Sequence, residues 1–395
     1  MILHHTTAFG ITERDASRNR SVARAAAARQ RINGWLSGSA NGLVLTGPAA
    51  VAWACGGVAP PVDRTASSDL VWAVFTADGA WLITTNVEAA RIMAEYDPSA
   101  HGFAGLAEAP WYSPGDFVAT AADLADLPAA SLASDGNPGF GRDVSDDLIA
   151  LRLALSAAER DDLAELGADA AHALQASLAQ WQPGERDLDV QARCSGYLEA
   201  TGADTPVLIV GGDDRLERYR HPMAIGAPVR RLVMAVVVAR RAGLHVALTR
   251  FASAGPLEHG YAALRRKVLA IDDAVLASCT PGTSYGTALE SLASAYAANG
   301  AEGGWKGHYQ GGPIGFAQRE FEIAPGQAES RWYREPVTAG HAIAWNPSLP
   351  GGAKSEDTYL VTADGSLSLI TGARGWPSEI SDYGNSHPAV LEVGR

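Results

Sequence analysis

The side chains whose types and spacing could do chemistry gather in the C-terminal third of the chain. Residues 307–320 read Gly-His-Tyr-Gln-Gly-Gly-Pro-Ile-Gly-Phe-Ala-Gln-Arg-Glu, so an imidazole, amides, a guanidinium and a carboxylate stand among glycines. Glycine lets a backbone approach a ligand closely. Residues 344–347 (Ala-Trp-Asn-Pro) and 354–362 (Lys-Ser-Glu-Asp-Thr-Tyr-Leu-Val-Thr) add a further amide and two carboxylates. This set suits the binding of a small polar substrate and the transfer of a proton.

Three residues are candidate catalytic groups: His221, His308 and Glu356. The unperturbed pKa of imidazole lies near working pH, so a histidine suits general acid–base catalysis. His221 stands in a loop between two predicted strands, where the alternative is an ordinary surface histidine. His308 precedes a glycine-rich turn that could equally do no more than reverse the chain. Glu356, if buried, needs a partner, either a substrate cation or an ion pair with Lys354 or Arg319.

Six further residues are candidates for substrate binding: Arg319, Glu320, Asn346, Gln310, Gly312 and Trp345. The guanidinium of Arg319 could hold a carboxylate through two parallel hydrogen bonds. An amide both donates and accepts, so Asn346 could fix an amide or carboxylate substrate. The alternatives are a structural ion pair for Arg319, an Asn-Pro turn at Asn346 and a core position for Trp345.

The N-terminal part of the chain alternates between helical and strand patterns. The predicted elements are a helix over 21–35, strands over 42–48, 71–75 and 81–84, and a helix over 86–96. Asn86 is the expected N-cap of the second helix. Residues 134–142 are rich in Gly, Asp and Pro and are predicted to form a linker.

The C-terminal part begins with a capping box, because Ser156 is followed three residues later by Glu159. The elements predicted from there on are helices over 156–178, 186–201, 256–277 and 283–299, and strands over 207–212, 232–239 and 244–251. We therefore expect a two-domain α/β protein with domains at 1–145 and 146–395, which is a comfortable length for two cores.

Composition narrows the possible partners of the chain. Its 395 residues carry a net charge of −13 and no run rich in Lys and Arg, so we expect neither a nucleic acid nor a membrane as partner. No apolar run approaches the roughly 18 residues of a membrane span. Three widely spaced cysteines fit reduced thiols, and the N-terminus lacks a secretory signal pattern, so the expected location is cytoplasmic.

The C-terminal motifs resemble the GHGIG…HE, EPG and E-D-x-x-x-V-T elements of the pita-bread superfamily, which includes creatinase, prolidase, aminopeptidase P and methionine aminopeptidase. In the N-terminal part, Leu45-Thr46-Gly47-Pro48 with Trp53 is similar to a motif of the creatinase and prolidase N-terminal domain. The resemblance implies a creatinase N-terminal-like domain followed by a pita-bread catalytic domain, and a homodimer.

Metalloenzymes of this superfamily bind two divalent ions through two Asp, one His and two Glu. Registering on Thr249-Arg250 gives the residues at these positions: Val236 and Ala247 for the Asp pair, Gly312 for the His, and Asn346 and Glu356 for the Glu pair. His308 lies upstream of the histidine position and could substitute only with a change of register. One anionic ligand of five gives too little charge and too few donors, so we expect no metal and no other cofactor.

The loss of ligands resembles creatinase, which has this fold and works without metal. Creatinase also carries Ala at one ligand Asp position, and it uses a histidine equivalent to His221 as its general base. It keeps the Glu of its EP motif, where this chain has Asn346.

The leading hypothesis is a metal-independent hydrolase or lyase that acts on a C–N bond of a small amide, guanidino or amino-acid-like substrate in specialised metabolism. The second hypothesis is a non-catalytic pseudo-peptidase that binds a peptide or metabolite. The third is a divergent Xaa-Pro metallopeptidase.

Overall fold

The structure is a computed structural model that describes residues 11–57, 62–66 and 70–393. It divides the chain into two compact units, Met1–Arg152 with Ser156–Glu159, and Leu153–Leu155 with Arg160–Arg395. The predicted boundary between the domains, after residue 145, lies at the start of helix α5 (Ser145–Leu153). Within the described ranges, no helix is long and apolar enough to cross a membrane.

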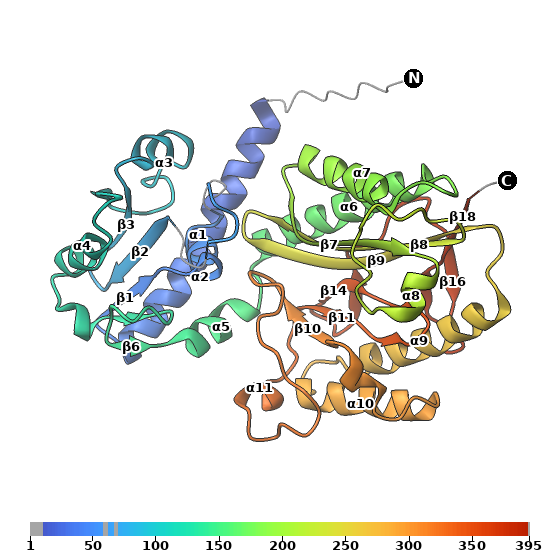
Figure 1. Cartoon of the computed structure of the whole chain (residues 1–395). Coiled ribbons are helices and arrows are strands. Elements are labelled where there is room, and N and C mark those ends of the chain that lie inside the picture. The colour runs from blue at the N-terminus through green and yellow to red at the C-terminus, as the bar shows by residue number, and fades with distance from the viewer. Residues whose placement is uncertain (1–10, 58–61, 67–69, 394–395) are drawn as a thin grey trace. The chain divides into compact units, whose positions relative to one another are not determined.

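The first unit is a six-stranded sheet with helices on both faces (Figure 1). Its strands, in the order β4-β3-β2-β1-β5-β6, are β4 (Leu106–Ala109), β3 (Ala80–Thr85), β2 (Val71–Thr76), β1 (Gly42–Leu45), β5 (Ala133–Ser134) and β6 (Arg142–Asp143). The helices are α1 (Ile11–Ser39), α2 (Pro48–Ala54), α3 (Ala89–Glu95) and α4 (Gly115–Ala125). Val44 and Val74 pack against Phe117 of α4. On the other face, Arg29 of α1 lies over the ring of Phe75 at 4.9 Å.

Two local predictions for this unit were wrong. Residues 134–142 are not a linker, because β5 and β6 extend the sheet and the carboxylate of Asp135 accepts the backbone N–H of Gly47 at 2.7 Å. The polar composition of this segment thus serves hydrogen bonds in tight turns. Asn86 does not cap α3, which begins after Glu88, and its side-chain oxygen instead accepts the N–H of Trp111 at 3.1 Å.

The second unit contains two four-stranded sheets. The first sheet has the order β18-β9-β8-β7, with β18 (Leu391–Val393), β9 (Leu244–Ala254), β8 (Leu232–Arg241) and β7 (Asp204–Gly212). The second sheet has the order β10-β11-β14-β15, with β10 (Gly311–Ile314), β11 (Ala342–Trp345), β14 (Asp357–Val361) and β15 (Leu367–Leu369). Strand β7 is an edge of the first sheet, so one side of its backbone has no neighbouring strand there.

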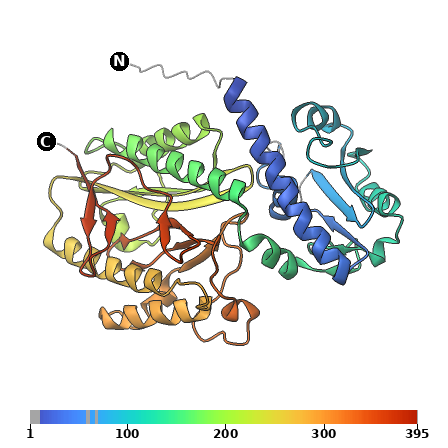
Figure 2. The same ribbon diagram turned by 180° about the vertical axis from the view of Figure 1, so that it is seen from behind.

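Helices cover the two sheets of the second unit from outside (Figures 1 and 2). Helices α6 (Ala157–Ala179) and α7 (Asp187–Ala200) lie over the first sheet, and α9 (His259–Ala277) and α10 (Tyr285–Ala298) lie beyond the second. The predicted capping box is confirmed, since the backbone N–H of Ser156 donates to the Glu159 carboxylate at 2.6 Å and the Glu159 N–H donates back to the Ser156 hydroxyl at 3.4 Å.

Polar side chains join the two sheets where β9 passes β14. The hydroxyl of Thr358 donates to the carbonyl of Ala247 and accepts its N–H, both at 2.8 Å. Nearby on the same two strands, Arg250 of β9 and Asp357 of β14 form a buried ion pair at 2.7 Å. The Arg250 guanidinium also donates to the carbonyl oxygen of Thr371. These bonds set which residues of β9 face which residues of β14.

Replacing Arg250 by Met should destabilise the second unit by about 3–5 kcal/mol, because it leaves the Asp357 carboxylate buried without its partner. The matched control is Arg231→Met, whose ion pairs with Asp214 and Glu258 are exposed; it should cost less than about 1 kcal/mol. Urea denaturation followed by fluorescence measures both. Equal costs for the two variants would contradict the role given to the buried pair.

Candidate functional site

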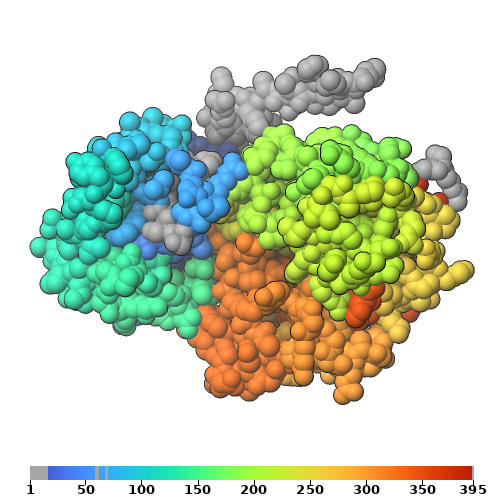
Figure 3. Space-filling view, in the orientation of Figure 1, coloured from blue at the N-terminus to red at the C-terminus, as the bar shows by residue number. Residues whose placement is uncertain are grey.

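A pocket of about 900 Å³ opens in the second unit. Its walls come from α7, β7, β8, the loop after Arg218, and the segments around 308–322 and 346–356. Figure 3 shows the orange surface of the segment around 300–320 adjoining the yellow-green surface of the segment around 210–230. The pocket therefore brings together parts of the chain that are far apart in sequence.

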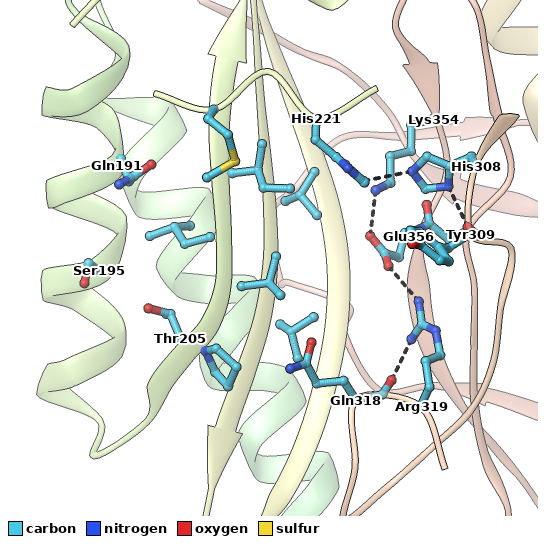
Figure 4. Close-up of a pocket in the computed structure, with 18 of the residues that line it drawn as sticks. Gln191, Ser195, Thr205, His221, His308, Tyr309, Gln318, Arg319, Lys354 and Glu356 are labelled. Carbon is cyan, nitrogen blue, oxygen red and sulfur yellow. Dashed lines mark hydrogen bonds and ion pairs between the residues drawn. The ribbon is translucent and has the colours of Figure 1, made fainter. Parts of the chain in front are cut away.

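A buried ionic cluster forms one wall of the pocket (Figure 4). The carboxylate of Glu356 lies 3.3 Å from the ammonium of Lys354 and 3.7 Å from the guanidinium of Arg319. It also accepts the hydroxyl of Thr249 at 2.8 Å. Lys354 and Glu356 are almost fully buried, and Arg319 keeps 19% of its side chain exposed.

Neighbouring charges keep the carboxylate of Glu356 ionised. Burial raises the pKa of the Glu356 carboxyl, but Lys354, Arg319 and the bond from Thr249 outweigh burial and leave this pKa below its ordinary value. Burial lowers the pKa of Lys354, and the attraction of Glu356 only partly opposes that effect. Glu356 is thus already neutralised by protein cations, so the expectation that it could bind a substrate ammonium or guanidinium loses its basis.

The structure brings two of the predicted catalytic residues into contact. His221 and His308 face each other with their Nε2 atoms 3.1 Å apart. The Nδ1 atom of His308 lies 2.5 Å from the carbonyl oxygen of Tyr309, which can only accept, so Nδ1 carries a hydrogen. In neutral His308 the Nε2 atom is then an acceptor, and His221 must donate from its own Nε2. The Nδ1 atom of His221 is left without a hydrogen.

Both imidazoles are held in the neutral form. Burial and the nearby charge of Lys354 lower the pKa of His308 to about 3. The same two causes, burial first, lower the pKa of the more exposed His221. His221 therefore offers an unprotonated Nδ1 at neutral pH, which is the state a general base requires.

The sheet supplies an apolar wall beside this polar one. Val236 of β8 lies between Ile209 of β7 and Thr249 of β9 in the strand register, so the three side chains share one face. Thr249 reaches Glu356 from that face, which places Ile209 and Val236 on the side of the ionic cluster. Val207 and Val238 form the next row and also line the pocket.

Asn346 presents a polar atom that lacks a protein partner. Its side chain is only 6% exposed and lines the pocket, and its Oδ1 atom has no hydrogen-bond partner among the described residues. An unsatisfied buried acceptor costs free energy until something donates to it. A ligand N–H is a donor that would satisfy it.

Four of the predicted binding residues lie outside the pocket lining. The amide of Gln310 donates to the carbonyl oxygens of Trp305 and His308, and Glu320 accepts the backbone N–H of Phe316 at 2.7 Å. Both side chains hold the loop through these hydrogen bonds, and their role in substrate binding stays a prediction. Trp345 is likewise a core residue.

The indole N–H of Trp345 donates to the sulfur of Cys279 at 3.1 Å, so this side chain points away from the site. Gly312 has no side chain to contribute, and its φ of 141° is a backbone conformation that favours glycine. The segment 310–320 thus contributes mainly through Arg319 and Gln318.

Lys354, Gln318 and the two apolar rows also line the pocket, although none of them was predicted as a site residue. Lys354 was considered only as an ion-pair partner, and the apolar rows led by Val207 and Val236 were read as core strands. A signal was present for Lys354, because residues two apart in an extended chain point to the same side, and Lys354 and Glu356 have that spacing. The apolar wall has no sequence signal that separates it from ordinary core.

The residues at the ligand positions implied by the resemblance do not fit a divalent metal. In the described ranges, no group of three or more His, Cys, Asp or Glu side chains could hold a metal ion. Val236, Ala247 and Gly312 offer no donor atom, and the remaining carboxylate, Glu356, is paired with two cations that would repel a metal ion. We therefore derive no chemical step through a metal.

Comparison with solved structures identifies the fold. The prolidase from Pyrococcus horikoshii OT3 is 16% identical, with 88% of this chain and 99% of that chain covered and a TM-score of 0.69. The dipeptidase PepE from Mycobacterium ulcerans is 20% identical, with 96% and 98% covered and a TM-score of 0.69. The N-terminal domain of the FACT complex subunit SPT16 from chickpea (Cicer arietinum) is 13% identical, with 90% and 96% covered and a TM-score of 0.64.

The chain therefore has the two-domain pita-bread fold of prolidases and Xaa-Pro peptidases, and the predicted fold class is confirmed. No family model matches the sequence, and no curated protein sequence is significantly similar to it. At these identities the likeness establishes the fold alone. The same fold occurs in enzymes and in a subunit of a complex, so the chemistry has to be argued from the site.

Replacing Lys354 by Met should raise the pKa values of both His221 and His308, because it removes the cation that repels their protonated forms and leaves the attraction of Glu356. Titration of the imidazole NMR signals measures this shift. Lys267→Met, at an exposed position of α9, is the control and should leave both values unchanged. Unchanged histidine pKa values in Lys354→Met would show that the charge of Lys354 does not act on these two imidazoles.

The lowered pKa of His308 also predicts a pH dependence of stability. The unfolded chain binds a proton at this residue near pH 6.5, and the folded chain binds it only near pH 3. The native state therefore loses stability as the pH falls through that window. His308→Gln should lose less stability than the wild type between pH 7 and pH 4 in denaturant titrations. Parallel losses would show that His308 titrates normally.

Proposed function

We propose that this protein is a metal-independent enzyme that acts on a C–N bond of a small amide, guanidino or amino-acid-like substrate. The observation that carries the proposal is the neutral His221–His308 pair at the mouth of a pocket whose inner wall is the Lys354–Glu356–Arg319 cluster. Proton transfer needs a base, an acid and a fixed charge to stabilise the transition state, and these residues provide all three.

His221 is the proton carrier in this proposal. Its Nδ1 atom takes a proton from the attacking water in a hydrolysis. In an elimination it takes the proton from the carbon next to the one that bears the nitrogen, so that a carbon–carbon double bond forms as the C–N bond breaks. In both cases the proton is returned to the leaving nitrogen. His308 accepts the hydrogen bond from Nε2 of His221 and so holds the ring in the tautomer with a free Nδ1. Lys354 stabilises negative charge that develops on the substrate, and Asn346 accepts a substrate N–H.

The fold supports C–N chemistry without establishing it. The solved structures with this fold include a prolidase, a dipeptidase and an X-Pro aminopeptidase, which are named for cleaving such bonds. In this chain the residues at the implied metal-ligand positions are replaced by apolar residues, glycine and an amide. The polar groups that remain serve binding and proton transfer, which is why we propose a specialised metabolic reaction in place of general peptide turnover.

The second candidate is a binding protein without activity. It is favoured by one observation, namely that a FACT complex subunit shares the fold. Against it stands the paired tautomer of the two histidines, because simple binding does not require an unprotonated base. We further propose that the chain acts as a cytoplasmic homodimer on a small molecule.

His221→Ala should lower kcat by about 10²- to 10⁴-fold while the affinity for a non-reacting ligand is retained, because it removes the proton carrier and leaves the ionic cluster in place. The control is His172→Ala, an exposed position of α6. Turnover is followed by ammonia or amine release from a panel of amides and amino-acid derivatives. A variant that retains full turnover would remove His221 from the mechanism.

A further inference from the structure

The charges of the buried ionic cluster do not balance. Lys354 and Arg319 carry two positive charges and Glu356 one negative charge, so the buried cluster has a surplus of one positive charge. The two histidines add none at neutral pH. The other lining carboxylate, Glu322, forms no close ion pair among the described residues, although Arg319 acts on it at longer range; burial raises the pKa of Glu322, and Arg319 only partly opposes that effect.

A further cation, Arg220, precedes His221 in the chain, and its side chain lies outside the pocket lining. The guanidinium of Arg220 lies over Gly307, where an added Cβ would be 3.5 Å from Nη2. Arg220 forms no ion pair with any described residue, and burial lowers its pKa. This concentration of positive charge stands out in a chain whose net charge is −13. A buried surplus charge is costly unless a counter-charge accompanies it.

Arg319 has donors left for such a counter-charge. Within the part of the chain that the structure describes, its guanidinium makes one hydrogen bond, from Nη1 to the carbonyl oxygen of Gln318 at 2.8 Å. Its ion pair with Glu356 is long, at 3.7 Å. A guanidinium has five N–H donors in a planar fork that matches a carboxylate, so most of them are available to a ligand in the pocket.

The apolar wall of the pocket fits a different part of a ligand from the ionic cluster. Val207, Ile209, Val236 and Val238 form two cross-strand rows on the face that looks toward the cluster. Such a wall gains free energy only from a ligand that covers it with apolar surface. Asn346 adds a buried oxygen that could accept a hydrogen bond from a ligand N–H lying between the two walls.

We infer that the pocket binds an amphiphilic carboxylate, with the carboxylate on Arg319 and Lys354 and an aromatic or branched aliphatic group on the wall of Val207, Ile209, Val236 and Val238. This inference rests on the proposed function only in saying where the reacting bond lies: the C–N bond joins the two halves, with its N–H toward Asn346. Among the proposed substrates, the same surplus charge disfavours a guanidino compound that carries no carboxylate.

The test is calorimetric titration of the full chain at pH 7 with three probes: phenylacetate, phenethylamine and acetate. Phenylacetate should bind at least about tenfold more tightly than either of the others, because only it has both the carboxylate and the apolar group. Phenethylamine that binds as tightly as phenylacetate would overturn the charge argument. Acetate that binds as tightly would overturn the apolar half, and three probes without measurable binding would overturn both.

Two variants locate the ligand. Arg319→Gln should weaken phenylacetate binding by about 10- to 100-fold, which is the usual effect of losing a charged hydrogen bond. Val236→Thr, which replaces a methyl group by a hydroxyl of similar size, should weaken phenylacetate binding by a smaller factor. Arg231→Gln, at an exposed position of the same unit, is the control. Circular dichroism confirms that each variant is folded. Undiminished binding by folded Arg319→Gln would contradict the assignment.

The results also separate this inference from the proposed reaction. Phenylacetate that binds as expected in a protein without turnover on any amide would keep the ligand class and remove the catalytic proposal. Turnover on neutral or cationic amides that phenylacetate does not inhibit would keep the catalysis and remove the ligand class.

Discussion

The second unit depends on the contact between β9 and β14, where two sheets meet through polar side chains. Residues 249–250 of β9 and 356–357 near the start of β14 interact as two adjacent pairs. The pair of Arg250 and Asp357 is fully enclosed and holds the sheets together. The pair of Thr249 and Glu356, one residue earlier in each segment, faces the pocket. Because Arg250 and Asp357 directly follow Thr249 and Glu356 in the chain, their ion pair fixes the position of the pair that faces the pocket.

The cations around the carboxylate of Glu356 are side chains of the protein itself. In the metalloenzymes that the motifs resemble, several carboxylates share divalent ions. Here one carboxylate remains, and an ammonium and a guanidinium from the protein neutralise it. Protein cations cannot polarise a water molecule as a metal does, so in the proposed mechanism a neutral imidazole transfers the proton. In the inferred binding mode these cations hold a ligand carboxylate, so the substrate is expected to be an anion.

Much of the fold could be predicted from the sequence because its signals are local. The capping box at Ser156 and the apolar runs of β7, β8 and β9 are each contained within a few residues. The errors arose where a long-range partner decided the outcome. Asp135 bonds Gly47 across the first unit, and so a segment with the composition of a linker became part of a sheet.

The site was predicted less completely for the same reason. His221 and His308 could be selected by residue type, but only the fold shows that they share a hydrogen bond. The directions of Gln310, Glu320 and Trp345 depend on loop hydrogen bonds and core packing, to which residue type gives no clue. The charge balance of the pocket likewise became visible only when the burial of Lys354 was known.

Lys354 and Arg319 neutralise the carboxylate that would bind metal in the metalloenzymes that the motifs resemble. The most direct test is elemental analysis of protein purified without added metal or chelator, together with thermal unfolding during titration with Mn²⁺, Co²⁺ and Zn²⁺. We expect no stoichiometric metal and no increase in Tm with any of the three ions. One or two tightly bound ions per chain that raise the Tm would contradict it, and would return the site to metal-dependent chemistry.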